Sequence, residues 1–232
     1  MDRRIHDAFA AVTADAQLKG STKRFLREAR HPKRRRAPWL TPVLASLIVC
    51  LCCWGGFAYL NMPVSYISVD VNPSIELTLN RLHRVIAAQA WNTDGECVVQ
   101  QVRVNGLTYT EAIDALLESE AMQPFLTAQS ELTFTVSAAD QRTETLLLEG
   151  IGACAGCQKY RGQRGRANRE LVEEAHRQGL SFGKYKAYRA LQEQGYVITP
   201  EECREMSMAE LHRLLREQGP GHRRQQRHGR QE

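Results

Sequence analysis

Residues 66–80 read Tyr66-Ile-Ser-Val-Asp-Val-Asn-Pro-Ser-Ile-Glu-Leu-Thr-Leu-Asn80, and this stretch decides the fold. Its odd positions from Ile67 to Leu79 are apolar apart from Pro73, and its even positions are polar or aromatic. Such alternation is the period of a half-buried β-strand rather than of a helix. Because Pro73 cannot donate a ladder hydrogen bond, the chain must bend, bulge or lie at a sheet edge there. The pattern therefore predicts a strand with a local fault at Asn72-Pro73.

An uncharged apolar segment, residues 39–60, precedes this strand and is long enough to cross a bilayer as a single transmembrane helix. Residues 1–38 before it are too many for the n-region of a cleaved signal peptide. The run Lys33-Arg-Arg-Arg36 lies just before the segment, and no Lys or Arg occurs from Ala37 to Asn80. The positive-inside rule then places 1–38 in the cytoplasm and 61–232 outside. Much of the net charge of +5 faces the inner leaflet.

The patterns after the apolar segment predict an α/β (α+β) domain over 61–157. Strand signals cover 84–90, 96–104 and 131–137, Thr108-x-x-Glu111 is a capping box that opens a helix, and 143–150 fits either state. Residues 158–169 read as a basic, Gly-rich linker, and 170–218 as a small helical region. The caps expected for its helices are Asn168, Ser181, Thr199 and Ser207. We expect the basic tail 219–232 to be disordered.

The short cytoplasmic segment reads as helical, with Ile5, Phe9 and Val12 on one apolar stripe. A lone helix of this size is marginal in water, so the stripe needs a cover. Two covers fit the pattern, namely the bilayer surface and a cytoplasmic protein.

The run 68–96, SVDVNPSIELTLNRLHRVIAAQAWNTDGE, resembles the extracytoplasmic domain of RsgI-type anti-sigma factors through its S-x-D-x-N-P-S-x-E core. A fainter similarity extends to about residue 150 and returns at 174–189 and 198–215. The resemblance implies a bacterial, single-pass membrane anti-sigma factor that sequesters a sigma factor through Ile5, Phe9 and Val12. It further implies release by regulated proteolysis on an extracytoplasmic signal. The partners implied are the sigma factor, the membrane and an intramembrane protease. The extracytoplasmic side predicted for the basic tail argues against a nucleic-acid partner.

The Asn72-Pro73 bond has its own chemistry. Because the Pro73 nitrogen carries no proton, it cannot attack the Asn72 side chain. The opposite attack, of the Asn72 amide nitrogen on its own backbone carbonyl, remains open and would split the chain in a fold that holds the groups in place. The resemblance implies such a single-turnover self-cleavage, with Asn72 as nucleophile, Pro73 as the new N-terminus, and Asp70 and Ser74 in support. The alternative is an edge-strand proline beside a turn-forming Asn. Otherwise the protein is not expected to be an enzyme.

Cys154-Ala-Gly-Cys157 is most simply a local disulfide or a pair of free thiols. A thioredoxin-like site needs a βαβ unit, and zinc needs two further ligands at a recognisable spacing. We therefore expect no metal and no cofactor. The main alternative function is a membrane-tethered extracytoplasmic binding or structural module without a transcriptional partner. A thiol-active membrane protein is the third.

Overall fold

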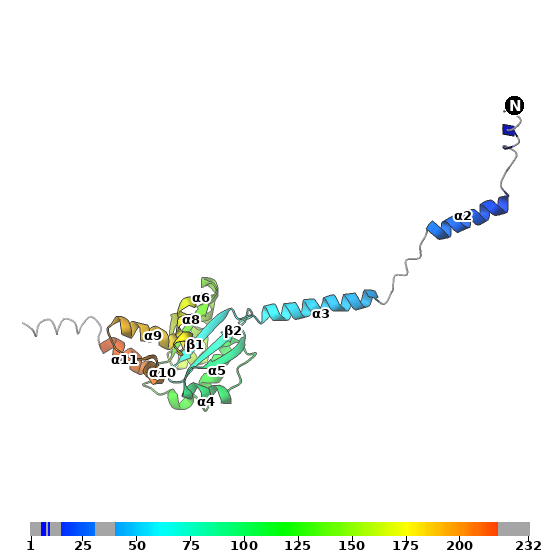
Figure 1. The fold of residues 1–232 in the computed structure, drawn as a ribbon. Helices are drawn as coiled ribbons and strands as arrows, with labels where there is room; N and C mark the ends of the chain where they lie inside the picture. Colours follow the sequence, from blue (N-terminus) through cyan, green and yellow to red (C-terminus); the bar gives the residue numbers. More distant parts are fainter. Residues whose placement is uncertain (1–5, 8, 10–14, 31–39, 218–232) are drawn as a thin grey trace, which may run out of the picture. The chain divides into compact units, whose positions relative to one another are not determined.

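The computed structural model describes residues 6–7, 9, 15–30 and 40–217 (Figure 1). Its contacts divide the chain into two units, Met1–Cys53 and Trp54–Glu232, and each is described by itself. The first unit holds helix α2 (Ala16–Arg30), and helix α3 (Leu40–Leu60) runs on into the second. Among the described residues, one helical stretch, Pro42–Leu60, is long and apolar enough to cross a membrane. This agrees with the single span predicted at 39–60. The predicted tail, 219–232, lies outside the described residues.

Residues 66–80 form a hairpin rather than the single faulted strand that the alternation predicts. Strand β1 (Ser65–Asp70) pairs antiparallel with β2 (Ser74–Leu79), and Asp70 lies opposite Ser74. The turn between them has three residues, 71–73. An odd turn keeps the parity of the pattern, so odd-numbered residues of both strands share one face. Apolar residues therefore stay at odd positions although the chain reverses its direction at 71–73. The reversal occurs where Pro73 lacks the N–H that a strand ladder needs.

The hairpin lies inside a five-stranded sheet of order β3-β2-β1-β4-β5. The other strands are β3 (Val85–Ala90), β4 (Thr133–Ala138) and β5 (Gln163–Arg166). All neighbours are antiparallel except β4 and β5. The strands expected at 84–90 and 131–137 are thus confirmed. In contrast, β5 lies within the segment predicted as a linker. Its Gln163, Arg164 and Arg166 side chains are exposed. This edge strand is held by backbone hydrogen bonds and therefore shows no apolar pattern in the sequence.

The odd-residue face of the hairpin contributes Ile67, Val69, Ile75 and Leu77 to the larger of two apolar cores. Four helices contribute to this core: α4 (Thr93–Gln101), α5 (Tyr109–Glu118), α6 (Gln141–Ala153) and α7 (Ala155–Lys159). A 3₁₀ turn, η1 (Gln123–Phe125), joins α5 to the segment before β4.

Helix α4 overturns the strand predicted at 96–104, where four valines favour a strand by propensity. The Asn92 side chain instead accepts the Gly95 N–H and caps a helix, and Asp94 and Glu96 lie in the first helical turn. Residues 143–150, which fit either state, are helical within α6. The predicted capping box of Thr108 and Glu111 is present at the start of α5.

The opposite, even-residue face of the sheet is covered by the C-terminal helices. These are α8 (Arg169–Arg177), α9 (Phe182–Glu193), α10 (Pro200–Glu205) and α11 (Met208–Glu217). The predicted caps Asn168, Ser181 and Thr199 are confirmed. These helices build a second core with Tyr66 of β1 packed against it. Figure 1 shows the strands between α4 and α5 on one side and α9 to α11 on the other.

Candidate functional site at the 71–73 turn

The turn that carries Asn72-Pro73 is fastened from several sides. Within it, the Val71 N–H donates to the Pro73 carbonyl over 3.0 Å. The Val71 carbonyl accepts the N–H of Met208, the first residue of α11, over 2.7 Å. On the far side of the turn, the Ser74 carbonyl accepts the Trp91 N–H over 2.9 Å. Pro73 is buried and Asn72 is half-buried. The backbone on both sides of the Asn72-Pro73 bond therefore has little freedom.

The side-chain amide of Asn72 is held at both of its ends. Its Nδ2 donates to Asp94 Oδ2 over 3.1 Å. Its Oδ1 accepts from Asn92 Nδ2 over 2.8 Å and from Lys184 Nζ over 3.3 Å. Chemically, a carboxylate faces the amide N–H while a neutral and a cationic donor face the amide oxygen. Such donors withdraw electron density from the amide and make its N–H more acidic, which favours transfer of a proton towards the carboxylate.

Asn92 and Asp94 reach the turn because the start of α4 is attached to it. Asn92 Oδ1 accepts both the Ser74 N–H and the Gly95 N–H, each over 3.0 Å. A Cβ on Gly95 would lie 2.7 Å from the Ser74 carbonyl oxygen, so only glycine permits this approach. The residue that caps α4, Asn92, therefore also holds the turn at Asn72 and Ser74.

Lys184 comes from the first turn of α9 and is only 1% exposed. Besides Asn72, its Nζ donates to the Arg204 carbonyl of α10. Burial lowers the pKa of Lys184 below its ordinary value, and the nearby charge of Asp70 opposes this shift. An ammonium group in this position is costly to bury, and the two carbonyl oxygens compensate for part of its lost hydration.

Asp70 contacts α9 rather than Asn72. The carboxylate is fully buried and accepts hydrogen bonds from the hydroxyl groups of Ser68 and Ser181, each over 2.6 Å. Burial raises its pKa, and the hydrogen bonds from Ser181 and Ser68 act against that rise. A Cβ on Gly183 would overlap Asp70 Oδ2, so the helix start lies directly on the carboxylate.

Glu76 of β2 makes a second attachment to the same helix start. It accepts the Phe182 N–H over 2.8 Å, and His176 Nε2 lies 2.7 Å from its other oxygen. The His176 ring in turn stacks on Trp91. Burial raises the pKa of Glu76, with the hydrogen bond to His176 acting in the opposite direction. Both acids of the S-x-D-x-N-P-S-x-E core thus place negative charge at the N-terminus of α9, where the helix dipole favours it.

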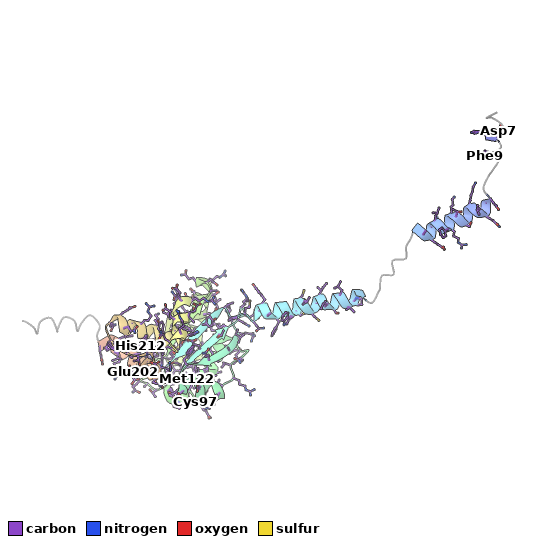
Figure 2. The ribbon with its side chains drawn as sticks, viewed as in Figure 1. Asp7, Phe9, Cys97, Met122, Glu202 and His212 are labelled. Atoms are coloured by element: carbon purple, nitrogen blue, oxygen red, sulfur yellow. The ribbon has the colours of Figure 1, made fainter. Side chains whose placement is uncertain are left out.

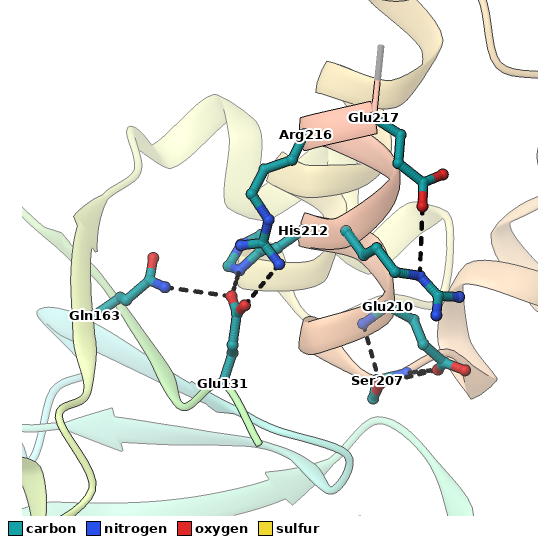
Figure 3. Close-up of polar contacts among 8 residues, drawn as sticks. Glu131, Gln163, Ser207, Glu210, His212, Arg216 and Glu217 are labelled. Carbon is teal, nitrogen blue, oxygen red and sulfur yellow. Dashed lines mark hydrogen bonds and ion pairs between the residues drawn. The ribbon is translucent and has the colours of Figure 1, made fainter. Parts of the chain in front are cut away.

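A cluster centred on Glu131 attaches α11 to the segment that leads into β4 (Figure 3). Glu131 lies 2.5 Å from His212 Nδ1 and accepts from Arg216 over 2.9 Å and from Gln163 over 3.3 Å. Burial alone raises the Glu131 pKa, but the Arg216 and His212 hydrogen bonds outweigh it and the net shift is downward. Helix α11, whose Met208 N–H donates to the Val71 carbonyl, is therefore also anchored away from the turn, through His212 and Arg216.

An open hollow of about 350 Å³ borders the turn. Val71 and Asn72 line it together with Phe125, Ser130 and Glu210. Water therefore has access to the exposed side of Asn72, although Pro73 itself is buried.

The remaining residues singled out from the sequence lie elsewhere. Ile5 and Val12 lie outside the described residues, whereas Phe9 is 77% exposed (Figure 2). Ser74 meets the site through its backbone, since its N–H donates to Asn92. Cys154 and Cys157 are buried free thiols, with the Cys157 N–H donating to Cys154 Sγ, and burial raises both pKa values. Neither thiol has the lowered pKa of a redox-active cysteine.

Asn92, Asp94 and Lys184 belong to the site but were not predicted from the sequence. Asn92 and Asp94 read as turn residues, and Lys184 reads as one of several basic residues on a helix. They lie 20, 22 and 112 positions from Asn72. The one local signal was the Asn-Thr-Asp-Gly run, which fits a helix cap as well as a turn.

The similarity to known proteins includes Asn72 and its side-chain partners Asn92, Asp94 and Lys184. Residues 64–190 match the model of a family described as the anti-sigma factor RsgI-like central domain. The chain is 26% identical over 181 residues to anti-sigma-I factor RsgI7 of Acetivibrio thermocellus, covering 75% of this chain and 33% of that protein. It is 27% identical over 138 residues to anti-sigma-I factor RsgI of Bacillus anthracis, covering 57% and 31%. The match thus spans about a third of the length of these curated relatives.

Proposed function

Because the chain belongs to the family of RsgI-type anti-sigma factors, we propose that it holds a sigma factor at the cytoplasmic face of a bacterial membrane. An extracytoplasmic signal would release that sigma factor through regulated proteolysis. Helix α3 is the proposed anchor, and the basic run at 33–36 favours a cytoplasmic N-terminus. The names of the relatives, all of them anti-sigma-I factors, support the regulatory role.

The sigma-binding segment in this proposal lies within residues 1–38. In helix α2, the large apolar side chains Leu18, Phe25 and Leu26 are exposed, as is Phe9 before the helix. Exposed apolar groups on an amphipathic helix are the usual means of helix-in-groove docking. Together with Ile5 and Val12, these groups would contact the sigma factor.

We further propose that the chain cleaves itself between Asn72 and Pro73, and the contacts of the Asn72 amide carry this proposal. Asp94 takes a proton from Nδ2 while Nδ2 forms a bond to the backbone carbonyl carbon of Asn72. The tetrahedral carbon then expels the Pro73 nitrogen, which takes up the proton from Asp94. The products are a fragment that ends in a five-membered succinimide and a fragment that begins at Pro73. Water from the adjoining hollow then opens the succinimide ring.

Cleavage at this turn would leave the domain assembled, because the bond lies between two paired strands. Strand β1 remains hydrogen-bonded to β2 and β4, in the middle of the sheet. The membrane anchor and the rest of the domain are then joined without a covalent bond, through the pairing and packing of β1 and the hydrogen bonds of Val71 and Asn72. Force or a ligand that extracts β1 would separate them, and an intramembrane protease would act on the remaining stub.

Two experiments on the full chain in membranes test these proposals. With a tag at each end, wild type should give a fragment that begins at Pro73, by intact mass, and Asn72→Ala should stay whole. An intact wild-type chain after long incubation would refute self-cleavage.

Deletion of residues 1–30 should abolish capture of a sigma factor from the bacterial host. If the full chain and the deletion capture the same proteins, the anti-sigma proposal fails. A membrane-tethered extracytoplasmic module without a transcriptional partner would then be favoured.

A further inference from the structure

The surroundings of Lys184 disfavour a positive charge. It is 1% exposed, and the hydrogen bonds of its Nζ go to two carbonyl oxygens, Asn72 Oδ1 and Arg204 O. A buried ammonium group without a closely paired carboxylate carries a large desolvation cost. Lys184 is also the third residue of α9, where the helix dipole disfavours a cation. Burial and the helix dipole therefore both oppose a charged lysine here, and the nearby charge of Asp70 does not fully offset the effect of burial.

The position of its ammonium group does match the chemistry proposed for Asn72. When Asp94 removes a proton from Nδ2, negative charge spreads over the amide and collects on Oδ1. Lys184 Nζ lies 3.3 Å from this oxygen, and the lysine side chain itself is buried, where a fixed cation is more effective than in water. Asn92 Nδ2, the other donor to Oδ1, is neutral. Lys184 is therefore the cation that faces the developing charge.

We propose that Lys184 is a catalytic residue of the self-cleavage, and that through it the cleavage requires the C-terminal helices to be folded on the sheet. This inference rests on the proposed cleavage at Asn72-Pro73. The ammonium group stabilises the amide anion at Oδ1, gives up no proton and is unchanged when Pro73 is released. Helix α9 lies 112 positions after Asn72 and is docked through Asp70 and Glu76. A chain that has not yet folded its C-terminal helices would then remain uncut.

The test uses the full chain, tagged at both ends and synthesised without cells in the presence of lipid nanodiscs. A short radioactive pulse followed by gel electrophoresis gives the first-order rate of cleavage. The variants are Lys184→Met, which keeps the length but removes the charge, Lys184→Gln, which keeps a neutral donor, and Lys184→Arg. Lys186→Met is the matched control, because Lys186 is exposed on the same helix and donates to the Arg166 carbonyl instead. Resistance of the domain to trypsin reports whether each variant is folded.

Loss of the charge should slow cleavage by roughly 10- to 100-fold in both neutral variants. Arginine should restore part of the rate, and Lys186→Met should leave it unchanged. A purely structural role would make trypsin resistance and rate fall together, whereas we expect the rate to fall in folded protein. The inference is overturned if wild type is cleaved and a folded Lys184→Met or Lys184→Gln variant is cleaved at the same rate. The proposed function would still stand in that case. An uncut wild type overturns both.

The pH–rate profile of wild type tests the same point without a substitution. The charged and titratable groups near Lys184 include Asp70, Asp94, Glu205, Glu210 and the Cys203 thiol. Burial raises the pKa of Cys203 to about 12, which is above the ordinary lysine value. The inference is supported if the cleavage rate falls as the pH is raised, at pH values lower than the ordinary lysine pKa of about 10.4 and in protein that is still folded. A rate that keeps rising through that range overturns it.

Discussion

Replacing Gly183 by alanine should detach α9 from the sheet. Gly183 is the second residue of the helix and lies over the buried carboxylate of Asp70. A Cβ at this position would overlap Asp70 Oδ2 and lie 3.2 Å from Thr135 Oγ1. Neither neighbour is the flexible end of a long exposed side chain, because both belong to strands in the middle of the sheet. The helix must therefore move outward, away from the hydrogen bond between Ser181 and Asp70.

Two effects of opposite sign set the magnitude. Alanine is the better helix former by up to about 1 kcal/mol. Forcing an extra methyl group into a packed site costs about 1–3 kcal/mol, and loss of a hydrogen bond to a charged group costs about 1.5–3 kcal/mol. The steric and polar losses outweigh the gain in propensity, so we expect a net destabilisation of about 2–4 kcal/mol. For a domain of this size, that lowers the melting temperature by roughly 5–15 °C.

Urea unfolding of residues 61–232, which contain both apolar cores, measures the effect. An Asn72→Ala background keeps the chain whole during the measurement. Gly152→Ala is the matched control, since Gly152 is also helical but its added Cβ meets only the guanidinium of the exposed Arg164. That side chain can swing away, so the control should be neutral or slightly stabilised. Equal stabilities for the two alanine variants would refute the close packing of α9 on Asp70.

Three further predictions follow from burial and charge. Replacing Ile67, which is fully buried in β1, by alanine should lower the free energy of unfolding by about 2–5 kcal/mol. In self-cleaved protein this should raise dissociation of the anchored fragment about 30-fold or more, measured by washing of immobilised protein, and unchanged retention would refute the role of β1. Because burial raises the pKa of Asp70, the native state binds its proton more tightly than the unfolded chain does. The stability of wild type relative to Asp70→Asn should thus be greatest at acidic pH and fall as pH rises through the raised value; a difference that stays constant from pH 7.5 to 4.5 would contradict this. Native alkylation followed by mass spectrometry should modify the exposed Cys97 and spare the buried Cys203, whose pKa of about 12 keeps it a neutral thiol; equal labelling would show that the α10 packing opens readily.

Much of the fold was predictable from the sequence because the signals are local. The alternation from Ile67 to Leu79 identifies one buried face whether the chain runs straight or reverses, and Pro73 marks where the ladder must break. Capping residues such as Thr108 and Thr199 act on N–H groups three positions away, so their helices could be placed without knowledge of the rest. Local propensity was misleading at 96–104, where a cap at Asn92 outweighs four valines.

The candidate site was only partly predictable. Asn72-Pro73 could be singled out from the sequence, because a proline inside an alternating strand pattern removes a ladder N–H. Asp70 and Ser74 were predicted as support because they lie close to Asn72 in the chain. In the structure Asp70 faces α9, and Ser74 meets the site through its backbone N–H. Residues two apart on a strand share a face, yet what lies across that face depends on which helix covers it.

The amino-acid sequence by itself determined the apolar helix, the alternating apolar face, the helix caps and the position of the proline fault, because each depends on groups a few residues apart. Only the tertiary structure decided that Asp94 and Lys184 meet the two ends of the Asn72 amide. Those contacts exist because the two faces of one sheet are covered by different helices, α4 from one core and α9 from the other. Both helix starts converge on the turn at the end of the central hairpin, and packing over 112 positions of chain leaves no local trace in the sequence.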